Sequence, residues 1–161
     1  MKYWMRNASD IIKNIMSKIK VFLDSSAVMA GVISSKGAAR VLLVMSETGQ
    51  IESFISEHVI VETERSLARK VPDALPDFRQ AIKDANLNII KNPTEKEIAD
   101  NLYLIADPDD VPILLAAMKA NVDYLATHNT KHFIDDPKVA ERSGIKIGTP
   151  GDVLVWLREN L

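Results

Sequence analysis

The 161-residue chain contains no cysteine. This absence excludes disulfide bonds, thiolate zinc sites, iron–sulfur clusters and cysteine nucleophiles. The three histidines, His58, His128 and His132, are too scattered along the sequence to indicate a histidine-rich metal cage. Cysteine-based metal and redox chemistry is therefore ruled out by composition alone.

The chain also lacks a long apolar run and an excess of basic charge. No uncharged stretch approaches the ~20 residues of a transmembrane helix, and Arg6, Asn7, Ser9 and Asp10 interrupt the apolar core that a signal peptide requires. We therefore expect a cytoplasmic protein with no membrane segment. A net charge of −2 and a pI near 5.9 argue against a protein that coats nucleic acid. The same values argue less against an enzyme, because the acidic residues around a metal site lower the net charge of the chain.

Short β-rich runs alternate with helical stretches along most of the chain. The expected strands are residues 18–23, 51–55, 88–91, 122–126 and 145–147. The expected helices are residues 38–45, 56–70, 77–85 and 94–106, another after the 107–110 turn, and a last one from 149–150 to the C-terminus. The length and the 47% of apolar residues suit one globular domain. The alternation predicts an α/β fold, a three-layer α/β/α sandwich around a mainly parallel sheet of about five strands.

The first 17 residues stand apart from this alternation. Ile11, Ile12, Ile15 and Met16 form an apolar stripe. We expect residues 1–17 to form a helical extension, either packed on the domain or binding a partner, and residues 18–161 to form the domain itself.

Two acidic residues follow the first two expected strands. In open parallel sheets, ligands gather at the carboxyl ends of the strands, and Asp24 stands directly after the first one. Its neighbour Ser25 can donate a hydrogen bond to a phosphate or a metal-bound water. Glu62 lies in the next helix, near the same rim. The alternatives are that Asp24 merely caps or turns the chain after the strand, and that Glu62 lies on a solvated face or forms a surface pair with Arg65, worth roughly 0.2–0.5 kcal/mol.

A third acidic feature is the turn that carries Asp107, Asp109 and Asp110. Capping of the following helix explains one of the three carboxylates. Three in four residues repel one another unless a cation or a helix N-terminus compensates. Asp110 is nearest the helix start and is our candidate ligand. Carboxylates that converge in a cleft are the ligands that Mg²⁺ and Mn²⁺ prefer.

Several segments in this order resemble the successive motifs of the PIN-domain family, which includes VapC-like toxins and PilT N-terminus-like ribonucleases. The segments are residues 22–27, 55–62, 109–117, 123–133 and 147–150. The resemblance covers roughly residues 18–161. Each motif alone is short and permissive, and the ordered set at these spacings is much more specific.

The resemblance implies a metal-dependent nuclease, commonly the toxin of a toxin–antitoxin pair that cleaves RNA. Carried over by position, the catalytic and metal-binding acids are Asp24, Glu62 and Asp110, and the metal is Mg²⁺ or Mn²⁺. The family often has a further acid after the fourth strand, where this chain has Asn129. Asn129 brings no charge, which favours one metal site over two.

Further roles follow from the same resemblance. The residues expected to hold substrate or metal-bound water are Ser25, Thr127, Asn129 and Lys131. Lys36, Arg40 and His132 are candidates for contact with the nucleic-acid backbone. For Lys131 and His132, an ordinary solvated loop is an equally good interpretation. The expected partners are RNA, an antitoxin protein and a second copy of the chain.

The leading hypothesis is therefore a Mg²⁺- or Mn²⁺-dependent endoribonuclease that leaves a 5′-phosphate and a 3′-hydroxyl. The alternative is a PIN-like module that binds RNA or a protein without cutting, which the missing fourth acid motivates. A phosphotransfer domain fits poorly. A haloacid-dehalogenase-like phosphatase needs a second Asp where Ser26 stands, and a receiver needs an Asp after the third strand, where residues 88–93 offer none.

Overall fold

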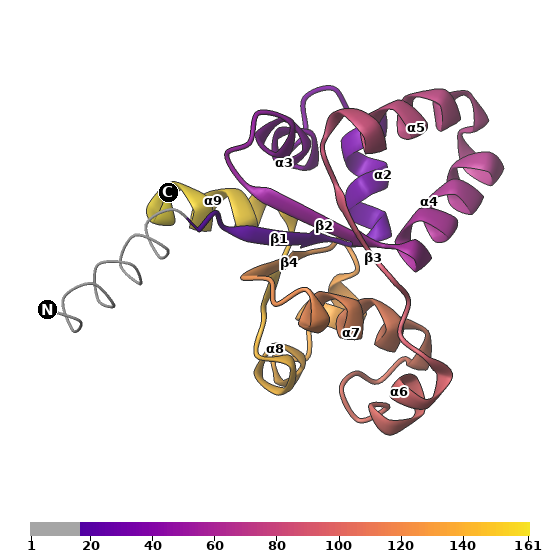
Figure 1. Cartoon of the computed structure of the whole chain (residues 1–161), viewed down its shortest axis with the longest axis vertical. Coiled ribbons are helices and arrows are strands. Elements are labelled where there is room, and N and C mark those ends of the chain that lie inside the picture. The colour runs from indigo at the N-terminus through magenta and orange to yellow at the C-terminus, as the bar shows by residue number, and fades with distance from the viewer. Residues whose placement is uncertain (1–16) are drawn as a thin grey trace, which may run out of the picture.

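Five parallel strands form a single sheet in the computed structural model, which describes residues 17–161 (Figure 1). The strands are β1 (Lys20–Leu23), β2 (Glu52–Ser56), β3 (Asn88–Ile90), β4 (Tyr124–Ala126) and β5 (Lys146–Gly148). They lie in the order β3-β2-β1-β4-β5, and every neighbouring pair is parallel. The central strand β1 is buried on both faces, since Val21, Phe22 and Leu23 are all solvent-inaccessible or nearly so. The predicted sheet is confirmed.

Helices cover both faces of the sheet, as predicted for a three-layer α/β/α sandwich (Figure 1). One layer holds α2 (Ser25–Ile33), α3 (Ala38–Glu47), α4 (Glu57–Lys70) and α5 (Leu75–Asp84). The opposite layer holds α6 (Glu95–Asp100), α7 (Val111–Lys119) and α8 (Lys138–Ser143). The last helix, α9 (Pro150–Asn160), packs against α3, β4 and β5. Three short helical turns are η1 (Pro72–Ala74), η2 (Pro108–Asp110) and η3 (Thr130–Ile134).

Three regions of the chain differ from the sequence-based expectations. The helix α2 was not expected, because its residues are apolar on almost every side and show no amphipathic period. The helix predicted over 94–106 ends at Asp100, and the apolar Leu104 and Ile105 are buried from a turn instead. The short helical segments η3 and α8, between β4 and β5, were also not expected.

The proposed helical extension over residues 1–17 lies outside the described residues except for Ser17, so that boundary stays a prediction. Within residues 17–161, no single helix has the length and apolar character needed to cross a membrane. The bent pair α2 and α3 passes that test by length and composition only.

The order of the strands places a crevice at one end of the sheet. From β1 the chain moves outward to β2 and β3, and it then returns to the other side of β1 as β4 and β5. The two strands that flank this reversal, β1 and β4, end at Leu23 and Ala126, which are paired in register. Ligands of open α/β sheets bind beyond the carboxyl ends of the strands at such a reversal. The residues that follow β1 and β4 are Asp24 and Thr127.

Candidate active site

Asp24 is held at the carboxyl end of the central strand by a set of hydrogen bonds. Its backbone N–H donates to the carbonyl of Ala126 (3.0 Å), which fixes it beside β4. Its Oδ1 accepts from the backbone N–H of Ser25 (2.7 Å), so Asp24 also caps α2. Its Oδ2 accepts from the hydroxyls of Thr127 (2.7 Å) and Ser26 (3.2 Å). The carboxylate is thus fixed in orientation by groups from both strands of the crevice.

Burial makes the charge of this carboxylate costly. Asp24 is 3% exposed, and this burial raises its pKa above the ordinary value. The hydrogen bonds from Thr127, Ser25 and Ser26 lower the pKa in part, while the negative charge of Glu62 raises it further. A buried acid with a second acid close by is an arrangement found at functional sites and metal sites.

Glu62 reaches the same region from α4. The hydroxyl of Ser56, the last residue of β2, accepts from the backbone N–H of Val59 and so starts this helix directly at the end of its strand. Glu62 lies in the second turn, and its Oε2 is 3.3 Å from Nε2 of His58, four residues earlier. The hydrogen bond to His58 is the main reason that the pKa of Glu62 is lowered, and a bond to Ser25 contributes. The sequence analysis missed this role of His58, although the i, i+4 spacing indicates it.

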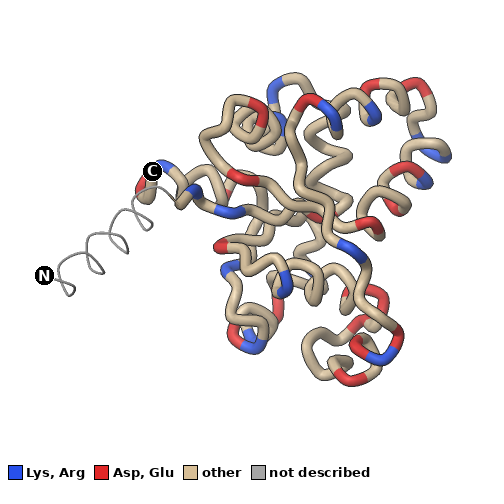
Figure 2. Tube along the Cα trace, viewed as in Figure 1, with Lys and Arg blue, Asp and Glu red and all other residues tan. Residues whose placement is uncertain are grey.

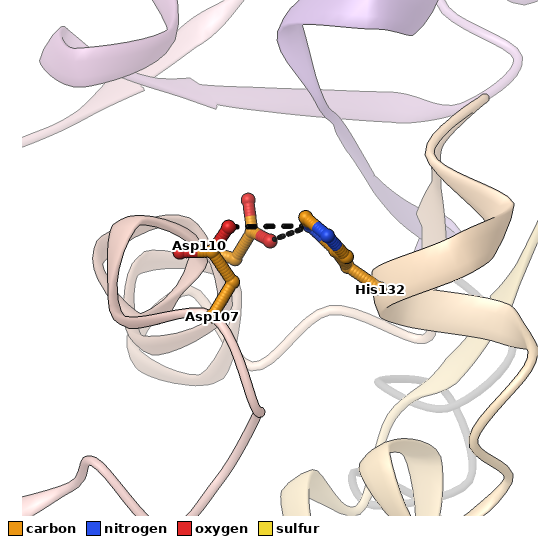
Figure 3. Close-up of side chains that lie close together, drawn as sticks. All are labelled: Asp107, Asp110 and His132. Carbon is orange, nitrogen blue, oxygen red and sulfur yellow. Dashed lines mark hydrogen bonds and ion pairs between the residues drawn. The ribbon is translucent and has the colours of Figure 1, made fainter.

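Asp110 faces a histidine from a distant part of the chain. Its Oδ2 is 2.6 Å from Nδ1 of His132, and an oxygen of Asp107 is 3.5 Å from the same nitrogen. Figure 3 shows the two carboxylates, from one turn around η2, pointing toward the imidazole carried by η3. One ligand atom from each of the three side chains lies within 4.8 Å of the others. The sequence analysis named Asp107 in the acidic turn and His132 as a candidate backbone contact, but it did not predict that the two meet beside Asp110.

Burial dominates the ionisation of Asp110. Its side chain is only 13% exposed, and the resulting desolvation raises its pKa to about 6. The contact with His132 lowers the pKa, whereas the charges of Asp107 and Asp24 raise it. Asp24 is thus close enough to both Glu62 and Asp110 for their charges to interact. The three acids selected from the sequence occupy one region at the carboxyl rim of the sheet.

The other predicted residues have different surroundings. Thr127 is fully buried and donates to Asp24, and its hydroxyl also accepts from the backbone N–H of Asn129 (2.9 Å). The side-chain oxygen of Asn129 accepts from the backbone N–H of His132 (3.3 Å), so Asn129 caps η3. Lys131 is exposed and lines a hollow of about 500 Å³ with Asp107 and His132. Asn129 therefore shapes the loop that holds His132.

Acidic positions from two layers of the fold frame the rim. In Figure 2, those of α4 and those of the segment from α6 to η2 lie on the same side of the molecule. A cleft of about 650 Å³ runs between them and is lined by Glu62, Asp109 and Asp110. Oxygen ligands of this kind suit a hard divalent cation such as Mg²⁺ or Mn²⁺.

Comparisons with known proteins found a matching family model and similar folds. The family model of the PIN domain matches residues 20–131. Among solved structures, the chain is similar to VapBC2 from Rickettsia felis, crystallised bound to a DNA fragment from its promoter. The identity is 17%, the match covers 81% of this chain and 98% of that one, and the TM-score is 0.58. It is also similar to PAE2754 from Pyrobaculum aerophilum, with 15% identity, 88% and 90% of the two chains covered, and a TM-score of 0.61. No curated protein matches the chain. The structural likenesses, at these identities, concern the fold.

Proposed function

This chain belongs to the PIN-domain family, and from that premise we propose that it is a metal-dependent endoribonuclease that hydrolyses phosphodiester bonds in RNA. The observation that carries the proposal is the buried Asp24 carboxylate, whose charge interacts with those of Glu62 and Asp110. Such a group of acids is unfavourable in isolation and favourable around a divalent cation. PIN domains are typically nucleases of this kind, and the strand order supports a ligand site at this rim.

The donor set fits a hard cation. Asp24, Glu62 and Asp110 offer only carboxylate oxygens, and the pKa values of Asp24 and Asp110 are raised by burial and by neighbouring acids. We propose that these three residues hold Mg²⁺ or Mn²⁺. When bound, the ion activates a water and offsets charge on the phosphodiester during in-line attack.

The surrounding residues keep these carboxylates in place. Thr127 and Ser26 donate to the Oδ2 of Asp24, and the backbone N–H of Ser25 donates to its Oδ1, so the carboxylate is held in a fixed orientation. His58 contacts Glu62, and His132 contacts Asp110. Ser25, which interacts with both Asp24 and Glu62, and the loop residues Asn129 and Lys131 are the proposed contacts for substrate.

The test is an RNA-cleavage assay on the purified chain. We expect cleavage of single-stranded RNA with Mg²⁺ or Mn²⁺, no cleavage with EDTA, and recovery when the metal is returned. Asp110→Asn keeps the shape and removes the charge, and we expect a loss of at least about 100-fold, the scale of one electrostatic group in an active site. Cleavage that is independent of metal and unchanged in this variant would sink the proposal.

A binding module that does not cut RNA is the second candidate. It is favoured by Asn129, which stands where the family often has a fourth acid and which here caps η3. RNA binding without cleavage over a range of divalent metals would establish this alternative. Cleavage that copurifies with the wild-type chain and disappears in Asp110→Asn would remove it.

The biological setting is a further proposal. We propose that the chain acts in the cytoplasm as the toxin of a toxin–antitoxin pair, forms a homodimer, and is neutralised by an antitoxin protein. The family resemblance and the structural similarity to VapBC2 support this setting. Growth arrest on expression of the wild type, but not of Asp110→Asn, is the expected result. Harmless expression of a demonstrably active enzyme would contradict the toxin role.

A further inference from the structure

The cleft beside the acids has two different halves. It measures about 650 Å³ and lies between α4 and the segment that includes α6, η2 and the start of α7. Its lining residues are His58, Val61, Glu62, Arg65, Ile98, Pro108, Asp109, Asp110 and Pro112. One half carries acids of the proposed catalytic rim, and the other offers apolar surface and one arginine.

Arg65 is the arginine of this cleft. It is exposed, and its charge lowers the pKa of both His58 and Glu62, so its guanidinium lies near the acidic half. Among residues 17–161, no hydrogen bond or ion pair is recorded for its side chain, whereas Arg79 pairs with Glu64 from a neighbouring helix at 2.7 Å. A guanidinium presents several donors in a fork that matches phosphate oxygens. Arg65 thus has donors free to bind an anion.

The apolar half is formed by side chains from both walls. Val61 is 53% exposed, although it stands one residue before Glu62 on α4. Ile98 and Pro112 lie across the cleft and are each partly buried. Apolar side chains that line a recess next to a charged rim suit a flat ligand with a polar edge, such as a nucleobase.

The charges around the cleft determine what a nucleic-acid ligand requires of it. The four carboxylates Asp24, Glu62, Asp109 and Asp110 repel a polyanion, and a nucleic acid therefore needs cationic contacts on the protein as well as the metal. Arg65 supplies such a contact at the edge of the acids. Because the cleft includes Glu62 and Asp110 of the proposed catalytic rim, a nucleic-acid chain held there for cleavage extends past Arg65.

We propose that this cleft is a nucleotide subsite, in which Arg65 binds the phosphate next to the scissile one and an unpaired base packs against Val61 and Pro112. The proposal rests on the proposed RNA-cleaving function and adds to it the residues that bind the nucleotide next to the scissile phosphate. In a duplex the base stays stacked and paired, so it does not enter a recess of this kind.

The experiment measures binding of a short fluorescein-labelled single-stranded RNA by anisotropy over a series of salt concentrations, in Ca²⁺, with the probe checked for integrity. Arg65→Gln removes one phosphate contact. We expect roughly 10-fold weaker binding, and a slope of log affinity against log salt that is smaller by about 0.7, the value for one phosphate on a single strand. The charge-matched control is Arg158→Gln, an exposed arginine in the last turn of α9, which should change neither quantity.

Val61→Ser tests the apolar half separately. We expect binding about 3-fold weaker with the salt slope unchanged, because a base contact involves no counterion release. An RNA with an abasic position at the subsite should bind Val61→Ser and wild type equally well. Duplex RNA of the same sequence should bind more weakly than the single strand to the wild type.

The outcomes separate this proposal from the one on which it rests. If the wild type cleaves RNA in a metal-dependent way but Arg65→Gln binds with the affinity and salt slope of Arg158→Gln, the subsite is overturned and the nuclease stands. If Val61→Ser leaves binding unchanged, or if duplex RNA binds as well as the single strand, the base recess is overturned. If the wild type shows no metal-dependent cleavage, the proposed function itself fails.

Discussion

Two aspartates on adjacent strands, one at each end of the sheet, have opposite surroundings. Asp123 precedes β4 at the amino end, is exposed, and exchanges hydrogen bonds of 2.8 Å with the backbone of Lys20. Asp24 follows β1 at the carboxyl end, is 3% exposed, and has a raised pKa because of burial and the charge of Glu62. At the amino end, Asp123 links two strands by hydrogen bonds. At the carboxyl end, burial and a neighbouring acid disfavour the charge of Asp24. The comparison shows that environment separates a structural carboxylate from a candidate ligand.

A second comparison lies within the site. Glu62 and Asp110 each contact a histidine, yet the pKa of Glu62 is lowered and that of Asp110 is raised to about 6. The side chain of Glu62 is 44% exposed, whereas that of Asp110 is 13% exposed. For Glu62 the hydrogen bond to His58 outweighs desolvation, and for Asp110 desolvation outweighs the bond to His132. Contact with a histidine therefore accompanies a lowered pKa for the more exposed Glu62 and a raised pKa for the more buried Asp110.

The largest expected effect compares the two ends of the sheet directly. Asp24→Asn removes the charge at the carboxyl end, and we expect RNA cleavage to fall by at least about 100-fold, as for the loss of one electrostatic group in an active site. Asp123→Asn makes the same change at the amino end and keeps an oxygen for the N–H of Lys20. We expect its cleavage rate to stay near wild type. Equal cleavage rates for Asp24→Asn and Asp123→Asn in a gel-based assay would contradict a catalytic role for Asp24 that Asp123 lacks.

Metal binding should stabilise the fold through residues at the carboxyl end of the sheet and not through those at the amino end. At a Mn²⁺ concentration of about 100 times Kd, linkage predicts roughly 2.7 kcal/mol of stabilisation for the wild type. For a chain of this size that is a rise in Tm of roughly 5–10 °C. Thermal unfolding of Asp24→Asn should show a much smaller rise, whereas Asp123→Asn should respond like the wild type. A full rise in Asp24→Asn would place the metal elsewhere.

The burial of Asp110 predicts how the free energy of unfolding depends on pH. Its pKa is 3.8 as a free group and about 6 in the fold. Between these values the folded state binds more protons than the unfolded state, so without metal the free energy of unfolding decreases as pH rises from roughly 4 to 6. Above this window the full destabilisation is present. The raised pKa of Asp24 acts in the same direction, as does that of His58, whose contribution is lost as pH rises through its folded pKa.

Asp110→Asn should therefore flatten this dependence. In EDTA, urea unfolding at several pH values is expected to show the wild type losing about 2 kcal/mol more than the variant as the pH rises through the window. Glu62→Gln serves as the contrast, because the lowered pKa of Glu62 stabilises the fold above about pH 4.5 and that contribution is lost only at lower pH. Identical pH profiles for wild type and Asp110→Asn would contradict the burial argument.

Much of the fold was predictable because its elements have local signals. All five strands are β-rich runs bounded by turns, and Thr149 and Thr94 are N-caps whose capping boxes start α9 and α6. The helix α2 was missed because a helix that is buried on most sides shows no periodicity. Its start is nevertheless marked by Asp24, whose capping role was considered as the alternative to metal binding and was not linked to a following helix.

The candidate site was predictable in its acids and not in their partners. Asp24, Glu62 and Asp110 came from the family motifs, and the fold brings them to one rim. The contact of His132 with Asp110 spans 22 residues and depends on the unpredicted segment η3. Local spacing carries no information on such a contact. Asn129 was expected to hold substrate or metal-bound water, and its capping of η3 likewise depends on the conformation of that loop.

The smallest expected effect is a difference in the free energy of unfolding between variants at the two ends of the sheet. Thr127→Val removes a buried hydroxyl that donates to Asp24 (2.7 Å) and accepts from the N–H of Asn129 (2.9 Å). Leaving these partners unsatisfied should cost about 1.5 kcal/mol in urea unfolding. At the amino end, Asp123→Ala removes one exposed bond to Lys20 and should cost about 0.5 kcal/mol, since water replaces it. Thr127→Ser keeps the hydroxyl and should recover most of the loss. If Thr127→Ser is as unstable as Thr127→Val, the packing of the lost methyl group, and not the hydrogen bonds, governs the stability at this position. The hydrogen bonds at the carboxyl end would then contribute no more to the free energy of unfolding than the one at the amino end.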